Sequence, residues 1–304
     1  VNNIPIDKCT ENGVVVFNTP GANANAVKEL VLAGLFLASR DIIGGNQWAN
    51  TLTGDDIGKQ VEKGKSNFGG NEIKGKTLGV IGLGAIGILV ANAAVHLGMD
   101  VIGYDPYLSV NNALQLNRHV KCVTDIKTIF TDCDFITVHV PLLDSTRDTI
   151  NAEAIDMMKD GVVILNYARG GLVNNDAIKA GLASGKVKKY VVDFPDEETI
   201  NVPGIIAIPH LGASTEESED NCAKMAADEI RDFLETGDIK NSVNFPNCSL
   251  PCDTVGRITI IHKNVPNMIA KYTDLLKEVN IAEMINKSKG DYAYTMLDIG
   301  AADV

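Results

Sequence analysis

A glycine-rich turn between an apolar strand and an apolar helix constrains the fold of this chain more than any other feature. The apolar segment Leu78–Ile81 predicts a buried parallel strand, and Gly82, Gly84 and Gly87 follow it with the spacing G-x-G-x-x-G. The first glycine permits a tight turn, and the second lets the backbone approach a phosphate group closely. The third lets the predicted helix Ile86–Leu97 pack against the strand.

An acidic residue lies at the position where such a turn needs one. Asp105 ends the next apolar strand, 18 residues after Gly87. A carboxylate there can accept hydrogen bonds from both hydroxyls of an adenosine ribose, and it would repel a 2′-phosphate. The free N–H groups and the positive dipole end of the helix suit a pyrophosphate. We therefore expect NAD rather than NADP as the cofactor, bound by Gly82, Gly84, Ala85, Ile86, Gly87 and Asp105.

Strand and helix signals alternate from Leu78 to His210, an order that is typical of βαβ units around a parallel sheet. Beside the strand before the turn, further apolar segments predict strands at Val101–Asp105, Phe135–Val140, Val162–Asn166, Tyr190–Phe194 and Ile205–Ile208. Helices are expected at Thr124–Cys133 and at Asn175–Ser184, where Gly185 ends the second. Six strands with right-handed crossovers form a doubly wound α/β sheet of the Rossmann type, which binds ligands at the carboxyl ends of its strands.

The segments around this sheet predict further helices. Asn25–Arg40 is apolar on most faces, so it must be buried almost all round, and a subunit interface could cover it. Gly44–Gly75 is polar and glycine-rich, which predicts a surface excursion with a short helix near Asp55–Lys63. Thr215–Leu234 predicts an amphipathic helix, and Asn244–Asp253 predicts a linker because it contains prolines.

The C-terminal segment has a different order of elements. Arg257–Ile261, Ala282–Asn286 and Tyr292–Ile299 predict strands, and Pro266–Lys277 predicts a helix between the first two. This β-α-β-β order is most of a small ferredoxin-like α+β domain, which normally continues with another helix and strand. We expect a partial domain of this kind at 254–304.

Composition excludes several classes of function. A net charge of −12 disfavours nucleic acid and anionic membranes as partners, because a negative surface attracts neither. No apolar run approaches the roughly 20 residues that a membrane helix needs. The scattered cysteines predict reduced thiols in a cytoplasmic protein without a metal site; they are Cys9, Cys122, Cys133, Cys222, Cys248 and Cys252.

Three residues after successive predicted strands suit the oxidation of a hydroxy acid: Arg169, Glu198 and His210. A guanidinium grips a carboxylate with two hydrogen bonds, an imidazole takes the hydroxyl proton, and a carboxylate orients the imidazole. Hydride transfer would belong to the cofactor. Taken singly, His210 could be a structural histidine and Glu198 a solvated acid. Arg169 precedes Gly170-Gly171, which leave it open to a ligand.

These residues lie in motifs that resemble those of the NAD-dependent D-2-hydroxyacid dehydrogenases. The resemblance extends over nearly all of the chain and is carried by the motifs Phe17–Gly21, Gly82–Gly87, His139–Pro141, Asn166–Val173 and Pro209–Thr215. The resemblance implies that Arg169 binds substrate, that His210 is the acid/base and that Glu198 orients it. It also implies that Asp193 binds the nicotinamide carboxamide. Further cofactor contacts are expected from His139, Val140, Pro141, Ala168, His210 and Gly212.

The C-terminal part narrows the resemblance. Ser242–Pro246 and Arg257–Ile299 resemble the linker and the ACT regulatory domain of those members that act on 3-phospho-D-glycerate. This implies NAD-dependent oxidation of that phosphorylated 2-hydroxy acid to 3-phosphohydroxypyruvate, the first step of L-serine biosynthesis, by a homodimer or tetramer. His262–Asn264 match a position where some members bind L-serine, so an amino-acid effector is a hypothesis. Asn267 replaces the glycine that often follows the proline.

The chain departs from the family pattern at its start. Members begin with roughly a hundred residues of substrate domain, about one small domain, whereas only Val1–Val16 precede the Phe17–Gly21 motif here. We therefore expect a remnant of the substrate domain at 1–20, the NAD-binding domain at 21–214, a crossover helix and linker at 215–253 and the partial ACT-like domain at 254–304. We also expect NAD(H) binding with little or no turnover, an expectation that robust 3-phosphoglycerate-dependent NADH production would contradict.

Other functions remain open from the sequence. A D-2-hydroxyacid dehydrogenase of the lactate or hydroxypyruvate type would keep its activity when the substrate phosphate is removed. A non-catalytic NAD-sensing module would bind NADH normally and keep its function in His210 variants. A mainly regulatory, amino-acid-binding protein would be stabilised by L-serine rather than by NADH, which a thermal-shift titration would distinguish.

Overall fold

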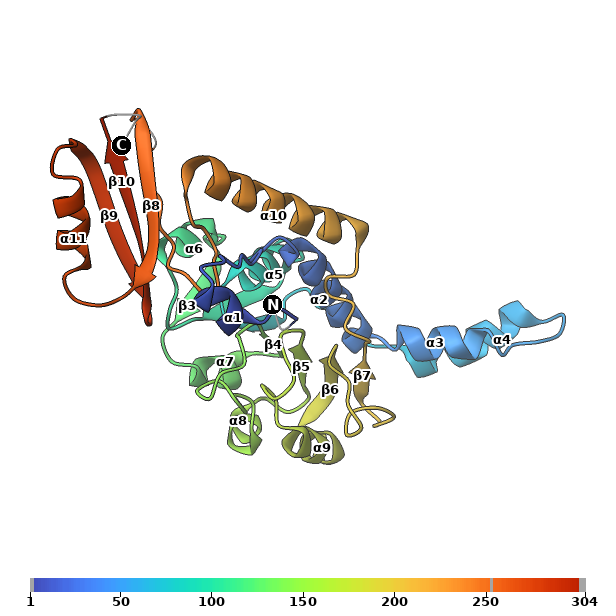
Figure 1. The fold of residues 1–304 in the computed structure, drawn as a ribbon. Coiled ribbons are helices and arrows are strands. Elements are labelled where there is room, and N and C mark those ends of the chain that lie inside the picture. Colours follow the sequence, from blue (N-terminus) through green and yellow to red (C-terminus); the bar gives the residue numbers. More distant parts are fainter. Residues whose placement is uncertain (1–2, 252–253, 301–304) are drawn as a thin grey trace. The chain divides into compact units, whose positions relative to one another are not determined.

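The computed structural model describes residues 3–251 and 254–300. The chain divides into two compact units (Figure 1). The central unit is Asn23–Ser218, and the flanking unit combines Val1–Ala22 with Glu219–Val304.

A seven-stranded sheet with the order β3-β2-β1-β4-β5-β6-β7 organises the central unit. All neighbouring strands pair in parallel. The strands are β1 (Thr77–Ile81), β2 (Asp100–Tyr104), β3 (Val120–Val123), β4 (Phe135–Val138), β5 (Val162–Asn166), β6 (Val187–Val192) and β7 (Ile205–Ala207). The strand order reverses between β1 and β4, which is the switch point where such sheets bind ligands. The expected doubly wound α/β sheet is confirmed.

The expectation of six strands was wrong by one, because β3 was not predicted. Its four residues, Val-Lys-Cys-Val, lie at the edge of the sheet, and only Val120 is buried. An edge strand needs no continuous apolar run, so its sequence carries little strand signal.

Two helical layers cover the sheet. The helices of the central unit are α2 (Ala24–Ser39), α3 (Ile42–Ala49), α4 (Ile57–Gly64), the 3-10 helix η1 (Lys65–Phe68), α5 (Ala85–His96), α6 (Val110–Gln115), α7 (Lys127–Asp132), α8 (Ala152–Met157) and α9 (Asn175–Ser184). Leu78 and Val80 of β1 pack with α2 and α5 in one core cluster. Ile81 packs with α7, α8 and α9 in the other, because alternate strand residues point to opposite faces.

The expected burial of α2 is supplied within the central unit. Val31 and Leu35 are fully buried in the core cluster that also contains residues of α5, β5 and β6. Phe36 is the largest side chain of α2 that stays exposed. After α2, the excursion expected at Gly44–Gly75 contains most of α3, together with α4 and η1. Figure 1 shows α3 and α4 extending away from the end of α2.

The flanking unit contains a small antiparallel sheet of order β8-β10-β9. Its elements are α1 (Ile6–Glu11), most of α10 (Glu216–Thr236), β8 (Gly256–Lys263), α11 (Met268–Leu275), β9 (Ile281–Lys289) and β10 (Tyr292–Ile299). The β-α-β-β order is the one expected from the sequence. Asn267, directly before α11, has φ +72°. This left-handed conformation favours glycine and, after it, asparagine, so the replacement noted above keeps the turn.

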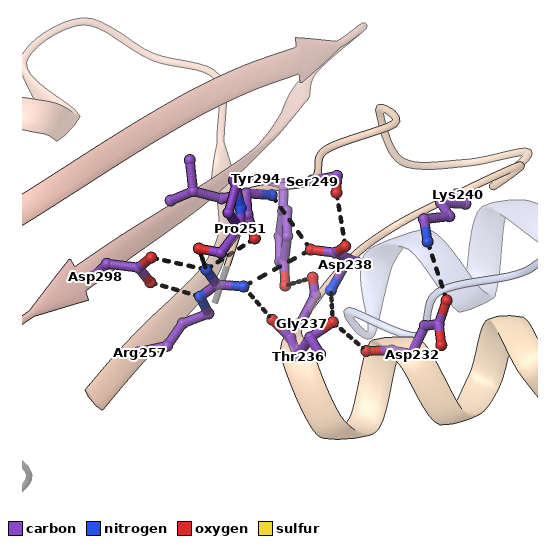
Figure 2. Close-up of polar contacts among 11 residues, drawn as sticks. Asp232, Thr236, Gly237, Asp238, Lys240, Ser249, Pro251, Arg257, Tyr294 and Asp298 are labelled. Atoms are coloured by element: carbon purple, nitrogen blue, oxygen red, sulfur yellow. Dashed lines mark hydrogen bonds and ion pairs between the residues drawn. The ribbon is translucent and has the colours of Figure 1, made fainter. Parts of the chain in front are cut away.

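A buried ion pair fixes this sheet to neighbouring segments of the same unit (Figure 2). Arg257 of β8 contacts Asp298, its register partner on β10, through Nε and Nη2. The same guanidinium donates from Nη1 to the carbonyl of Thr236 at 2.8 Å and from Nη2 to those of Leu250 and Pro251 at 2.9 and 2.7 Å. One side chain thus joins two strands, the end of α10 and the linker.

Cys9, Cys122, Cys133, Cys222 and Cys248 are free thiols, whereas Cys252 lies outside the described residues. Within residues 3–251 and 254–300, no helix combines the length and apolar character of a membrane span. In the same ranges, no cluster of three or more His, Cys, Asp or Glu side chains is arranged to hold a metal ion.

Candidate active site

The three glycines of the turn after β1 have different surroundings. Gly82 has φ +94°, and a Cβ there would lie 2.7 Å from the carbonyl oxygen of His139. A Cβ on Gly87 would collide with the carbonyl oxygen of Gly82, so this glycine lets the helix pack against the turn. A Cβ on Gly84 would have nothing within 4 Å. The open space therefore lies at Gly84, where a ligand can approach the backbone.

The start of α5 is free to bind an anion. Gly84 is its N-cap and supplies no side-chain hydrogen bond, so the first-turn N–H groups at Ala85 and Ile86 are not capped by a side chain. Asp105 follows β2 beside this turn. Its Oδ2 accepts from the Leu83 N–H at 2.9 Å and its Oδ1 from the Tyr107 N–H at 2.8 Å. These bonds orient the carboxylate and leave each oxygen a further lone pair for a ribose hydroxyl.

Asp193, which follows β6, is the second acidic residue expected at the cofactor. Its side chain is 1% exposed, and Oδ1 is buried without a hydrogen-bond partner. Burial raises the pKa of this carboxyl to about 6, although His210 and Arg169 nearby lower it in part. A buried acceptor of this kind suits the N–H of a carboxamide. Together with the open space at Gly84, it shows that the residues present fit NAD.

Arg169 and His210 both lie against one aromatic ring, that of Phe194. The guanidinium carbon of Arg169 lies 5.7 Å from the ring centroid of Phe194, and the His210 ring centroid lies 4.4 Å from it. Asn166 fixes the turn before Arg169, because its amide donates to the Arg169 carbonyl at 2.8 Å and accepts from the Ala168 N–H at 3.1 Å. Two of the three expected catalytic side chains are therefore brought together.

The backbone of His210 is strained. It has φ +33°, an uncommon conformation for a residue with a side chain. Its N–H donates to the Asp193 carbonyl at 3.0 Å, which ties the loop after β7 to the loop after β6. Gly212 lies at the same place, since a Cβ there would be 3.3 Å from Oδ2 of Asp193.

Glu198 is not part of this group in the structure. Its Oε2 accepts from Nζ of Lys179 at 2.9 Å, and its backbone N–H donates to Oδ1 of Asp196 at 3.0 Å. Among the described residues, the carboxylate that is expected to orient His210 thus has a lysine as its ionic partner.

His139, Val140 and Pro141 follow β4 next to the glycine turn. Nε2 of His139 lies 2.9 Å from Oγ1 of Thr137, and Nδ1 is buried without a partner. Burial lowers the pKa of this histidine to about 4, so its ring is neutral at pH 7. The Pro141 carbonyl accepts from Thr146 at 2.6 Å, which fixes the loop.

Phe194, Lys179 and Asn166 are not among the residues expected from the sequence. Asn166 and Phe194 are the last residues of two predicted strands, and this position at the ligand-binding edge of the sheet is a signal that could have identified them. Lys179 is 19 residues from Glu198, and no local pattern connects the two.

Comparison with known proteins identifies a family for this chain. Residues 32–212 match the model of the D-isomer specific 2-hydroxyacid dehydrogenase, NAD binding domain. D-3-phosphoglycerate dehydrogenase of Methanocaldococcus jannaschii is 35% identical over 294 residues, which are 94% of this chain and 53% of the relative. Hydroxypyruvate reductase of Thermotoga maritima is 39% identical over 228 residues, 72% of this chain and 70% of the relative.

The fold comparison agrees with the sequence comparison. The structure of a D-2-hydroxyisocaproate dehydrogenase matches with a TM-score of 0.69 and 25% identity, over 80% of this chain and 76% of that one. The chain spans about half the length of the M. jannaschii relative. The chain belongs to the D-isomer specific 2-hydroxyacid dehydrogenase family, whose NAD-binding domain its residues 32–212 match.

Proposed function

We propose that this protein oxidises 3-phospho-D-glycerate to 3-phosphohydroxypyruvate, or runs the reverse reduction, with NAD as the redox partner. The observation that carries the proposal is the meeting of Arg169 and His210 on Phe194, beside buried Asp193. Both follow strands of the sheet whose switch point holds the glycine turn. The names of relatives such as the M. jannaschii enzyme support the phosphorylated substrate.

Arg169, His210 and Asp193 have separate roles in the proposed reaction. Arg169 grips the substrate carboxylate and polarises the neighbouring oxygen. His210 takes the proton of the C2 hydroxyl in oxidation and returns it in reduction. Bound NAD would supply the hydride acceptor for oxidation and the hydride donor for reduction. Asp193 would hold NAD by accepting a hydrogen bond from the N–H of its carboxamide.

A substrate without phosphate is the second candidate. The similarity to a hydroxypyruvate reductase, at 39% identity, favours it specifically. The two candidates differ in one chemical group, so a matched pair of keto acids distinguishes them.

The test is reduction by bound NADH under single-turnover conditions, with this chain in excess over NADH. We expect the absorbance of reduced nicotinamide to decay with 3-phosphohydroxypyruvate and much more slowly with hydroxypyruvate. His210→Asn and Arg169→Met should abolish the decay, whereas His119→Asn, an exposed histidine remote from these residues, should not. Equal or faster decay with hydroxypyruvate would replace the proposed substrate, and failure to bind NADH would overturn the site.

We also propose an ACT-type regulatory role for the flanking sheet. Its support is the β-α-β-β order and the strand order β8-β10-β9. Nε2 of His262 lies 2.9 Å from Thr295 and 3.2 Å from Asn286, so this ring already has partners in the sheet. An amino-acid effector would have to displace them. A thermal shift with L-serine supports the role, and an unchanged melting temperature at saturating L-serine contradicts serine as effector.

We propose that α3, α4 and η1 bind a second copy of the chain. Ile42, Ile43 and Ile57 are 52%, 43% and 39% exposed in a segment whose inward contacts are mostly among its own elements, such as Trp48 with Phe68. Exposed apolar side chains gathered on one segment are typical of an interface between proteins.

A further inference from the structure

Lys179 forms an ion pair with Glu198, the carboxylate that the proposed reaction needs at His210. It lies on α9, and its Nζ is 2.9 Å from Oε2 of Glu198 and 3.5 Å from Oδ1 of Asp176. The loop that carries Glu198 is fixed to the same helix a second time. The side-chain amide of Asn175 donates to Oδ2 of Asp196 at 3.0 Å. Glu198 is therefore anchored on α9.

His210 is held in a different place, although it follows the neighbouring strand. β6 and β7 pair in parallel, so Glu198 and His210 come from adjacent loops. The His210 ring packs on Phe194, and its N–H is bonded to the Asp193 carbonyl. An imidazole gains an orienting hydrogen bond only from a carboxylate that contacts it. In this structure that carboxylate contacts an ammonium group instead.

We propose that Lys179 is a positioning residue that withholds Glu198 from His210, and that acid/base chemistry requires Glu198 to move from Lys179 to His210. The proposal rests on the proposed function only for the Glu198–His210 pair. Lys179 does not touch the reacting atoms; it acts through Glu198. The family match and the resemblance assign no role to this lysine.

The energetics allow the exchange. The side chains of Lys179 and Glu198 are 36% and 56% exposed, and ion pairs exposed to this extent are weak. Asp176 already lies beside Lys179, so the ammonium keeps an ionic partner when Glu198 leaves. His210 attracts the carboxylate strongly only when its ring is protonated. The transfer is therefore coupled to proton uptake by His210, the event that the reaction produces.

Other charged groups lie near Lys179, Glu198 and His210 and stay the same when Lys179 is substituted. Asp176 lies beside Lys179 on α9, and Asp196 and Glu197 flank Glu198 on its own loop. Asp193 interacts electrostatically with His210 and with Arg169. Substituting Lys179 changes none of these side chains. A change in His210 that depends on Glu198 can thus be assigned to movement of Glu198.

The test follows the ring resonances of His210 by NMR as the pH is varied, in the chain without NAD or substrate. His210→Gln assigns the resonances. In Lys179→Met, freed Glu198 should stabilise the protonated ring, so the midpoint of the titration should rise by ~0.3 to 1 pH unit. Lys179→Arg, which keeps a cation for Glu198, should restore the midpoint of the unmodified chain. Lys186→Met, which removes a remote ion pair with Asp160, is the matched control and should change nothing.

Two results would overturn the proposal. One is an unchanged midpoint in Lys179→Met. The other is a rise that persists in Lys179→Met/Glu198→Gln, because the rise would then come from loss of the lysine charge alone. The titration uses neither cofactor nor substrate, so its outcome is independent of the single-turnover assay. If the midpoint of the His210 titration rises in Lys179→Met but the unmodified chain does not reduce the keto acid, the proposed role of Lys179 is supported and the proposed reaction is contradicted.

Discussion

Gly84 and Gly87 lie three residues apart, yet a methyl group would meet different surroundings at each. At Gly87 it collides with the Gly82 carbonyl, and at Gly84, where φ is −80°, it enters open space. Gly87 is therefore needed for the packing of the turn, and Gly84 leaves room for a ligand.

Gly84→Ala should weaken NADH binding by roughly 10- to 100-fold, the value of one or two charge-assisted hydrogen bonds, with little change in stability. Gly87→Ala should destabilise the fold by about 1–3 kcal/mol through overpacking, in addition to weakening NADH binding. Fluorescence titration with NADH and urea denaturation measure the two quantities. Gly58→Ala on α4, where a Cβ meets nothing within 4 Å, is the control and should keep full NADH affinity. Equal loss of stability in both turn variants would contradict the distinction.

Asp193 and His139 make opposite contributions to stability as the pH changes. The Asp193 pKa is raised to about 6 in the folded chain, so between pH 3.8 and 6 the folded state carries the extra proton and stability falls as pH rises. The His139 pKa is lowered to about 4, so between pH 4 and 6.5 the unfolded state carries the extra proton and stability rises with pH. Each contribution amounts to up to about 3 kcal/mol, and the two largely cancel.

Asp193→Asn should therefore expose the contribution of His139. We expect this variant to lose stability steadily on acidification through the range below pH 6.5, where the unmodified chain changes little. Urea denaturation followed by circular dichroism at several pH values measures the effect. His139→Gln should show the reverse, gaining stability on acidification. A parallel pH dependence in the unmodified chain and Asp193→Asn would show that the pKa of Asp193 is the same in the folded and unfolded states, which contradicts the raised value.

At the scale of elements, the pair of Arg257 and Asp298 determines how β8 and β10 meet the end of α10. The two side chains are 7% and 1% exposed, and the Tyr294 hydroxyl donates to the Gly237 carbonyl at 2.7 Å nearby (Figure 2). Removing one partner of a buried pair leaves the other charge without compensation, which is more costly than losing the pair as a whole.

Arg257→Met should destabilise the flanking unit by about 3–5 kcal/mol, and Arg257→Met/Asp298→Leu should recover part of that loss. Hydrogen exchange of the β8 and β10 amides measures stability within this unit. Arg231→Met, which removes ion pairs of a 57% exposed arginine, should change exchange by less than about 0.5 kcal/mol. Unchanged protection in Arg257→Met would show that the pair does not stabilise the sheet.

Some elements of this fold could be predicted from local sequence patterns, whereas contacts between distant residues could not. Local patterns suffice for α9 and β10, whose observed bounds, Asn175–Ser184 and Tyr292–Ile299, are the expected ones. Arg257 and Asp298 are 41 residues apart, and only the register of two antiparallel strands makes them partners. The Lys179–Glu198 contact depends likewise on tertiary structure. The edge strand β3 has no continuous apolar sequence, because a partly exposed strand does not need one.

At the scale of the whole molecule, the exposed isoleucines of α3 and α4 bear on assembly. Ile42→Ser/Ile43→Ser should shift the chain from a dimer toward a monomer at micromolar concentration, because apolar contact area is lost from both copies. Light scattering coupled to size-exclusion chromatography measures the mass. Leu275→Ser on α11, a side chain that is 79% exposed, is the control. The same mass for the unmodified chain and the double variant would contradict this interface.

The flanking unit joins the two ends of the described chain. The Val16 N–H donates to the side chain of Asn244 at 2.9 Å across 228 residues, and Phe17 bridges to Ser242. A ribosome makes 23–218 between these partners, so that segment can complete its own core while 3–22 still lacks its pairing strand. Residues 3–22 are therefore made before their partners and are among the last of the described residues to pack, and during that interval their apolar side chains are exposed to chaperones.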